Sequence, residues 1–235
     1  MFKRALIAAI ALFSIASSAT ADVLVGTPTN NPNQQDCIPF GCGVPNQFIF
    51  DSSYFSGPIS ITELQFFNSI QDPDPKTPDR FDPGTYTFKL ATSTNDYLSP
   101  SAIFAANVGA DVQLFATVVI GSDLVPPVFS FAGAAFNYNP ANGDLLLEVD
   151  KAGSNNTLSA FFDYNGPDDP NFKVSRIWNF DPSPSGDVNI NYGPVTNFIS
   201  TAVSPSPVPE PMTLTLTGLG LAGIAARLKK SRKQN

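Results

Sequence analysis

Apolar and polar residues alternate through most of the chain between residues 59 and 192. In "GTYTFKLAT" (84–92), Tyr86, Phe88 and Leu90 fall on one side of an extended chain, and threonines and a lysine fall on the other. This period of two predicts a half-buried β-strand. Further segments rich in β-branched and aromatic residues lie at residues 59–67, 112–120, 128–132, 145–149, 157–164, 173–180 and 188–192.

Turn residues separate these segments, as in Asp82-Pro83-Gly84 and Asn142-Gly143-Asp144. No stretch shows a sustained helical period, although residues 99–112 allow one short helical turn. Many short strands joined by such turns are typical of an antiparallel sandwich. The sequence therefore predicts an all-β fold, a single antiparallel β-sandwich that is jelly-roll-like, over residues 22–200.

The N-terminus has the pattern of a secretory signal peptide over residues 1–21. Lys3 and Arg4 precede an apolar run (5–15), and Ala19-Thr20-Ala21 offers small residues for cleavage before Asp22. An uncleaved anchor is the alternative, but an 11-residue helix spans roughly 16 Å of a bilayer core of ~30 Å. We therefore expect cleavage and export.

The C-terminus divides into three parts. A proline-rich linker (201–211) precedes an uncharged run (212–226), which as a helix is about 22 Å long and would cross a membrane only with local thinning or snorkelling. A basic tail (227–235) follows, and positive residues beside a spanning helix stay cytoplasmic, so the main domain faces outward. The basic residues that give this topology signal are Arg227, Lys229, Lys230, Arg232 and Lys233.

The order of Val208-Pro209-Glu210-Pro211, a short glycine-containing helix and a basic end resembles the PEP-CTERM sorting signal of Gram-negative exported proteins, over roughly residues 207–233. The resemblance implies that an exosortase recognises Pro209, Glu210 and Pro211 and cleaves the tail. The ectodomain would then be released or transferred to the cell surface or to extracellular polysaccharide. The alternative is an ordinary single-span anchored protein that is never processed.

Charge excludes one class of partner. Residues 22–207 contain six lysines and arginines against nineteen acids, a net charge of −13. Such a domain repels nucleic acids and anionic membrane surfaces. The chain has no histidine, so triads and zinc sites that depend on histidine are excluded as well.

The two cysteines, Cys37 and Cys42, are predicted to form a disulfide after export, because that compartment is oxidising. The loop they close is very short, so the bond contributes only about 2 kcal/mol. A metal site would need further soft ligands, which the chain lacks.

Two acidic patterns suggest chemistry in the main domain. Glu63 and Glu148 are its only glutamates, and a pair of carboxylates could serve glycoside hydrolysis; the alternative is that each lies on the solvent side of a strand. A proline-rich loop could bind calcium, or it could simply be solvated. Its candidate ligands are Asp72, Asp74, Asp79 and Asp82, with a weaker candidate set at Asp163, Asp168 and Asp169.

Aromatic side chains offer a further possibility. Trp178, with Tyr192 and Tyr97, could stack on sugar rings, although most aromatics of such a sandwich belong to its core. The favoured function is that of an exported surface or extracellular-matrix protein, structural, adhesive or polysaccharide-binding, and not catalytic. A polysaccharide-active enzyme is the alternative.

Overall fold

The computed structural model describes residues 22–29, 31, 34–40, 45–70, 80–152, 160–180 and 183–203. These residues belong to one compact unit, which ends at Val203. The predicted signal peptide, the sorting helix and the basic tail lie outside the described residues. In the part of the chain that the structure describes, no helix is long and apolar enough to cross a membrane.

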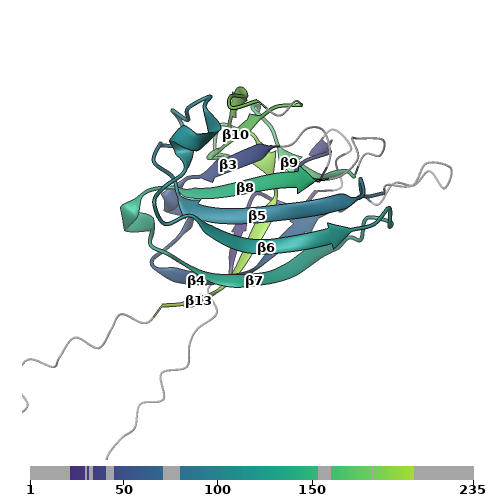
Figure 1. Ribbon diagram of the computed structural model, residues 1–235, viewed down its shortest axis with the longest axis horizontal. Helices are drawn as coiled ribbons and strands as arrows, with labels where there is room; N and C mark the ends of the chain where they lie inside the picture. Colours follow the sequence, from purple (N-terminus) through teal and green to yellow (C-terminus); the bar gives the residue numbers. More distant parts are fainter. Residues whose placement is uncertain are drawn as a thin grey trace, which may run out of the picture. The chain divides into compact units, whose positions relative to one another are not determined.

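The larger sheet has six strands in the order β11-β10-β3-β8-β5-β6, and every neighbouring pair is antiparallel (Figure 1). Strand β8 lies between β3 and β5, although it follows both of them in the chain. The strands are β3 (Asn46–Phe50), β5 (Gly84–Thr92), β6 (Gln113–Ile120), β8 (Leu145–Ala152), β10 (Val174–Trp178) and β11 (Asp187–Ile190).

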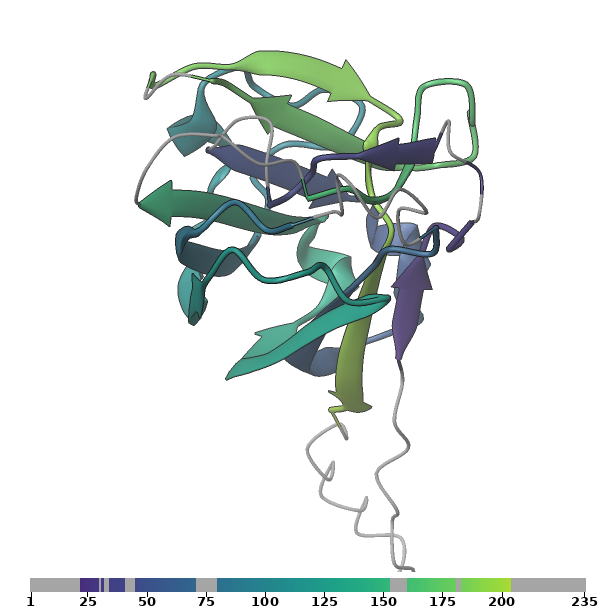
Figure 2. The ribbon, with the colours of Figure 1, turned by 90° about the vertical axis from the view of Figure 1, so that its right-hand side faces the viewer.

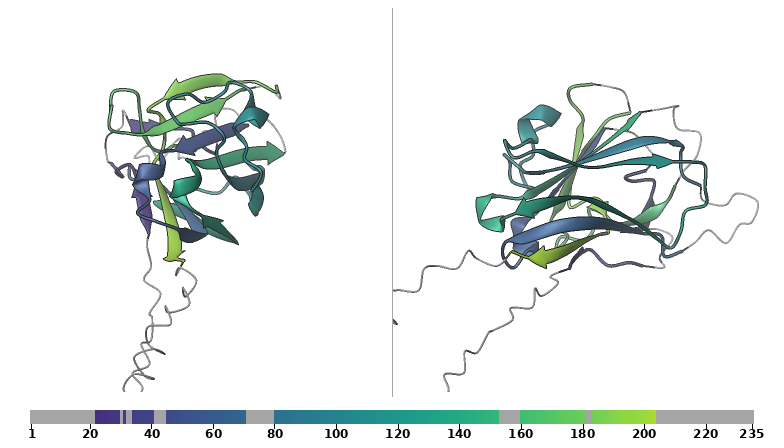
Figure 3. Two further views of the ribbon diagram at one scale, coloured as in Figure 1. Left: turned by 90° about the vertical axis from the view of Figure 1, so that its left-hand side faces the viewer. Right: turned by 60° about the horizontal axis from the view of Figure 1, so that its bottom comes forward.

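A four-stranded antiparallel sheet, in the order β1-β13-β4-β7, faces the larger one (Figure 3). It contains β1 (Val23–Val25), β4 (Ile59–Phe67), β7 (Val128–Tyr138) and β13 (Thr196–Ala202). A small three-stranded sheet completes the fold, with β2 (Gln35–Asp36), β9 (Phe162–Asn165) and β12 (Gly193–Pro194) in the order β12-β9-β2 (Figure 2).

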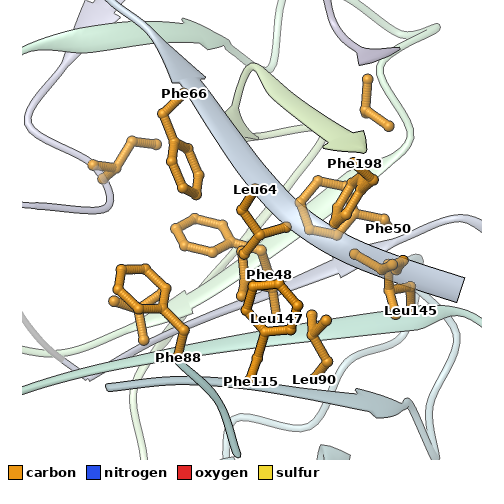
Figure 4. Packing of buried hydrophobic residues seen from close by; sticks show 14 of the residues in the cluster. Phe48, Phe50, Leu64, Phe66, Phe88, Leu90, Phe115, Leu145, Leu147 and Phe198 are labelled. Carbon is orange, nitrogen blue, oxygen red and sulfur yellow. The ribbon is translucent and has the colours of Figure 1, made fainter. Parts of the chain in front are cut away.

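The main core fills the space between the two large sheets, because alternate residues of each strand point inward. On β8, for example, Leu145, Leu147 and Val149 enter the core, whereas Glu148 and Asp150 point outward. Figure 4 shows side chains of both sheets meeting there. Those labelled are Phe48, Phe50, Leu64, Phe66, Phe88, Leu90, Phe115, Leu145, Leu147 and Phe198.

A second, smaller core lies on the outer face of the six-stranded sheet. It consists of Ile49, Ala91, Tyr97, Phe104, Leu146 and Ile177, with Val108 packed against it. The 3₁₀ helix η3 (Phe104–Asn107) supplies part of this cover and is the short helical turn that residues 99–112 allowed. The outer face of the sheet is therefore covered at one end.

The pairing of strands is nested: β5 pairs with β6, β4 with β7, β3 with β8 and β2 with β9. This is the pairing of one long hairpin folded over on itself. The all-β, antiparallel part of the expectation is confirmed. Its jelly-roll topology remains a prediction, because β13, rather than β9, pairs with β4 in the four-stranded sheet.

Candidate functional site: a groove on the outer face of the six-stranded sheet

A groove of about 600 Å³ lies on the outer face of the six-stranded sheet, beside the second core. Its floor comes from β5 and β8, whose outward-pointing side chains include Lys89, Glu148 and Asp150. The loop that contains η3 forms a wall. The lining residues of the wall and rim are Pro45, Ile103, Phe104, Ala105, Val108, Val112, Ser183 and Pro184.

The floor carries a connected group of polar side chains. The Nζ of Lys89 donates to Oε1 of Glu148 at 2.6 Å and to Oδ2 of Asp150 at 3.3 Å. Gln47 donates from Nε2 to the other oxygen of Glu148 at 2.7 Å. The contacts follow from the sheet register, in which both Lys89 and Gln47 lie opposite Glu148 on neighbouring strands.

Exposure differs within this group. The Glu148 side chain is only 14% exposed, whereas Lys89 and Asp150 are 36% and 44% exposed. The hydrogen bond that Lys89 donates to Glu148 raises the pKa of Lys89 above its ordinary value. Burial, and then the negative charge of Glu148, raise the pKa of Asp150. One ammonium group and two carboxylates thus give the floor a net negative charge at neutral pH, with Asp150 as its most accessible member.

The wall of the groove is apolar and firmly attached. Phe104 is buried, whereas Ile103 and Val112 are about half exposed, at 54% and 45%. The backbone N–H of Phe104 donates to the carbonyl of Pro184 at 3.1 Å, and its carbonyl accepts from Nε2 of Gln47 at 3.1 Å. The groove therefore combines an apolar wall with a charged floor, as ligand sites commonly do.

Asn107 and Gly186 explain why the wall lies where it does. The Asn107 side chain is fully buried and donates to Oε1 of Gln47 at 3.1 Å, while it accepts from the N–H of Ser101 at 2.8 Å. At Gly186, a Cβ atom would collide with the carbonyl oxygen of Trp178 and the ring of Phe104. A side chain at that position would push the β10–β11 connection away from the wall.

The two glutamates of the sequence analysis lie on opposite outer faces of the sandwich. Glu148 is on the floor of the groove, whereas Glu63 lies on β4 in the other sheet, in register with the exposed Ala132 and accepting from Nε2 of Gln65 at 2.9 Å. The main core separates them. They cannot flank one glycosidic bond, which retaining and inverting mechanisms both require.

Trp178 does not line the groove. It lies on β10 next to the buried Arg176. The guanidinium carbon of Arg176 lies over the Trp178 ring at 4.7 Å from its centre, and the Phe180 ring meets the indole edge-on with its centre at 4.7 Å. The indole Nε1 donates to Asn189 at 2.7 Å. Trp178 is thus half-buried with one face covered, so only part of its ring could contact a sugar.

The other two aromatics of the sequence analysis are held within the domain. Tyr97 is buried in the second core. Tyr192 is half-buried and donates its hydroxyl to Oδ2 of Asp36, beside Arg176. Neither contributes to the groove.

The residues of the calcium hypothesis are mostly beyond the described ranges. Asp72, Asp74 and Asp79 lie outside them, and the described Asp82 is buried and forms an ion pair with the equally buried Lys151. Asp163 is buried and accepts from the backbone N–H groups of Thr29 and Ser69. Among the described residues, no three His, Cys, Asp or Glu side chains come together as a metal site would need.

The predicted disulfide and the predicted sorting signal include residues outside the described part of the chain. Cys37 is buried at the start of the "CIPF" segment, while Cys42 lies outside the described residues, so their pairing stays a prediction. The same holds for Pro209, Glu210 and Pro211 and for the five basic residues of the tail.

The sequence analysis identified Glu148 but missed its partners Lys89, Asp150 and Gln47. A signal was present, because Glu148 and Asp150 are two residues apart and so share one face of a strand. The pattern could not show that Lys89 lies on the adjacent strand, since strand order is not encoded in alternation.

Comparison with known proteins bears on the C-terminus. A family model, the PEP-CTERM protein-sorting motif, matches residues 207–231. No curated protein and no solved structure matches the chain significantly. The chain is therefore an all-β protein that carries a PEP-CTERM sorting motif. That motif implies export, a membrane-anchored precursor, processing by an exosortase and sorting to the cell surface.

Proposed function

We propose that this chain is the precursor of an extracellular polysaccharide-binding protein, structural or adhesive and not catalytic. The observation that carries the proposal is the sorting motif at residues 207–231, because it assigns the domain to the cell surface, where polysaccharide is the abundant polymer. In this proposal residues 1–21 are removed on export, residues 212–226 span the membrane, and the exosortase cleaves near Pro209-Glu210-Pro211.

The groove supports the binding part of the proposal. Its apolar wall suits the C–H face of a sugar ring, and its floor offers carboxylate, amide and ammonium groups to hydroxyls. Its volume of about 600 Å³ is within the range of small-ligand sites. Its floor lies on two paired strands, β5 and β8, and its wall is hydrogen-bonded to Gln47.

The sorting part is tested by the mass of the mature protein. The protein is purified from the producing bacterium and from a strain without exosortase, and its intact mass and C-terminal residue are determined. We expect loss of residues 1–21 and of the chain beyond the motif in the first strain, and retention of the C-terminus in the second. Retention of residues 212–235 in both strains would establish a permanent single-span anchor instead.

The binding part is tested with the mature protein and polysaccharide from the same bacterium. Affinity electrophoresis should show retarded migration, and the polysaccharide should keep its chain length on prolonged incubation. Shortening of the polymer that is lost in Glu148→Gln would establish the enzymatic alternative. Glu63→Gln is the matched control, because Glu63 lies on the opposite face of the domain.

A further inference from the structure

We infer that the groove prefers polysaccharides with free amino groups, such as partly deacetylated hexosamine polymers, over neutral and acidic ones. This inference rests on the proposed polysaccharide binding and names the class of polymer that the same groove accepts. Three observations support it: the charge of the floor, the pairing of the domain's cations, and the position of the apolar wall.

The floor has one more carboxylate than it has ammonium groups. Glu148 is nearly saturated, because Lys89 and Gln47 each bond one of its oxygens. Asp150 is bonded by Lys89 more weakly, at 3.3 Å, and is 44% exposed toward the groove. A ligand ammonium that reaches Asp150 would restore neutrality and form a charge-assisted hydrogen bond, which is stronger than one to a hydroxyl.

An acidic polymer finds little to bind in the described part of the domain, because four of its five cations, all except Arg80, are already paired with acids. Lys89 pairs with Glu148 and Asp150, Lys151 with Asp82, Lys173 with Asp51, and Arg176 with Asp36. Arg80 donates to the carbonyl of Ser122. With a net charge of −13 over residues 22–207, the domain repels uronate and sulfate groups.

The apolar wall makes a sugar polymer a better occupant than a free amine or a small cation. Ile103 and Val112 are exposed hydrophobic residues at the rim, directly beside the charged floor. A hexosamine ring can place its C–H face on such a wall while its amino group is directed to Asp150. One hexosamine ring would then contact both the apolar wall and the charged floor of the groove.

The experiment measures binding of the mature protein to three immobilised polymers of similar length: chitosan, dextran and alginate. We expect chitosan to bind about tenfold more tightly than dextran in 150 mM NaCl, and alginate not to be retained. Chemical reacetylation of the chitosan amines should remove the preference. Asp150→Asn should weaken chitosan binding by about tenfold, the size expected for one charge-assisted contact.

Asp187→Asn is the matched control. It also removes one carboxylate, from an exposed position on β11 of the same sheet, opposite Trp178 and not among the residues that line the groove. Lys89→Gln is a second variant that raises the negative charge of the floor and should strengthen chitosan binding. Thermal melting of each variant establishes that it is folded.

The outcomes separate the inference from the proposed function. If none of the three polymers binds and the polysaccharide of the producing bacterium does not bind either, the proposed function is overturned. If dextran or alginate binds as well as chitosan, polysaccharide binding stands and the amine preference is wrong. If Asp150→Asn and Asp187→Asn weaken chitosan binding equally, attraction is a property of the whole acidic surface and the groove assignment is wrong.

Discussion

Two of the cations on the six-stranded sheet, Arg176 and Lys89, face opposite sides. Arg176 on β10 points toward the inside, where its side chain is 5% exposed, whereas Lys89 on β5 points outward into the groove. Each has acidic partners, yet their surroundings differ. Arg176 lies over the ring of Trp178 and donates from Nε to Oδ1 of Asn46 at 2.8 Å, so protein atoms close around it.

Arg176 is buried and Lys89 is partly exposed, and this difference shifts their pKa values in opposite directions. Loss of solvent lowers the pKa of Arg176 to about 10, because desolvation outweighs the attraction of Asp36. The pKa of Lys89 is raised instead, since the hydrogen bond that it donates to Glu148 outweighs partial burial. The Arg176 group therefore holds the small three-stranded sheet against the large one, while the Lys89 group remains available to a ligand. Four predictions test this contrast.

The largest effect is expected for Arg176→Ala. The variant removes a buried cation from its hydrogen bond and its ring contact and leaves Asp36 without its cationic partner, so the free energy of unfolding should fall by about 3 kcal/mol. Urea denaturation followed by fluorescence measures the loss. Lys89→Ala should cost less than about 1 kcal/mol, because its ion pairs are partly solvated. Equal losses in the two variants would contradict the contrast.

A smaller loss is expected for Tyr192→Phe. The hydroxyl of Tyr192 donates to Asp36, and burial raises the pKa of this tyrosine, so the group stays a neutral donor throughout the physiological range. Removing the donor should lower the free energy of unfolding by about 1 kcal/mol. The same denaturation assay applies, and a stability equal to that of the parent would show that the hydrogen bond is dispensable.

Lys89→Gln should affect binding more than folding. The change takes one positive charge from the floor, so the affinity for an amine-bearing polymer should rise by roughly three- to tenfold at low salt and by less at high salt. Titration of chitosan oligomers at two ionic strengths measures both effects. A gain that does not depend on salt would point to a cause other than charge.

The smallest effect concerns pH and Asp150. Since burial and Glu148 raise the pKa of Asp150 in the folded state above the ordinary 3.8, this group stabilises the fold at low pH, and the contribution is lost as pH rises through the folded-state pKa. The exposed carboxylate is screened, so the difference should be on the order of a few tenths of a kcal/mol. Asp150→Asn should therefore lose less stability than the parent between acidic and neutral pH, as measured by thermal melting.

Alternation predicted the regular strands well. Residues 59–67 and 84–92 coincide with β4 and β5. The strand β7 runs on to Tyr138 although only 128–132 was expected, because Gly133 and the alanines after it give no visible alternation while pairing with β4 resumes beyond them. The strand β3 was missed, since all five of its residues are buried and the sequence shows no period of two.

The groove could be predicted only in part. Glu148 was identified, but it was grouped with Glu63, which lies on the other sheet, because a linear pattern contains no information on which strands are neighbours. Trp178 was interpreted as a stacking surface for sugar rings, whereas in the structure Arg176 and Phe180 pack against its ring. The neighbours of Glu148 and of Trp178 both depend on pairing between strands, which the linear sequence does not show.

The position of β13 has a consequence for export. This last strand lies in the interior of its sheet, between β1 at the start of the domain and β4, so Phe198 pairs with Val23 on one side and with Leu64 on the other. The four-stranded sheet therefore lacks one of its two inner strands until residues 196–202 are in place. If the export that the sorting motif implies delivers the chain unfolded, the sandwich can be completed only after almost the whole domain has been translocated.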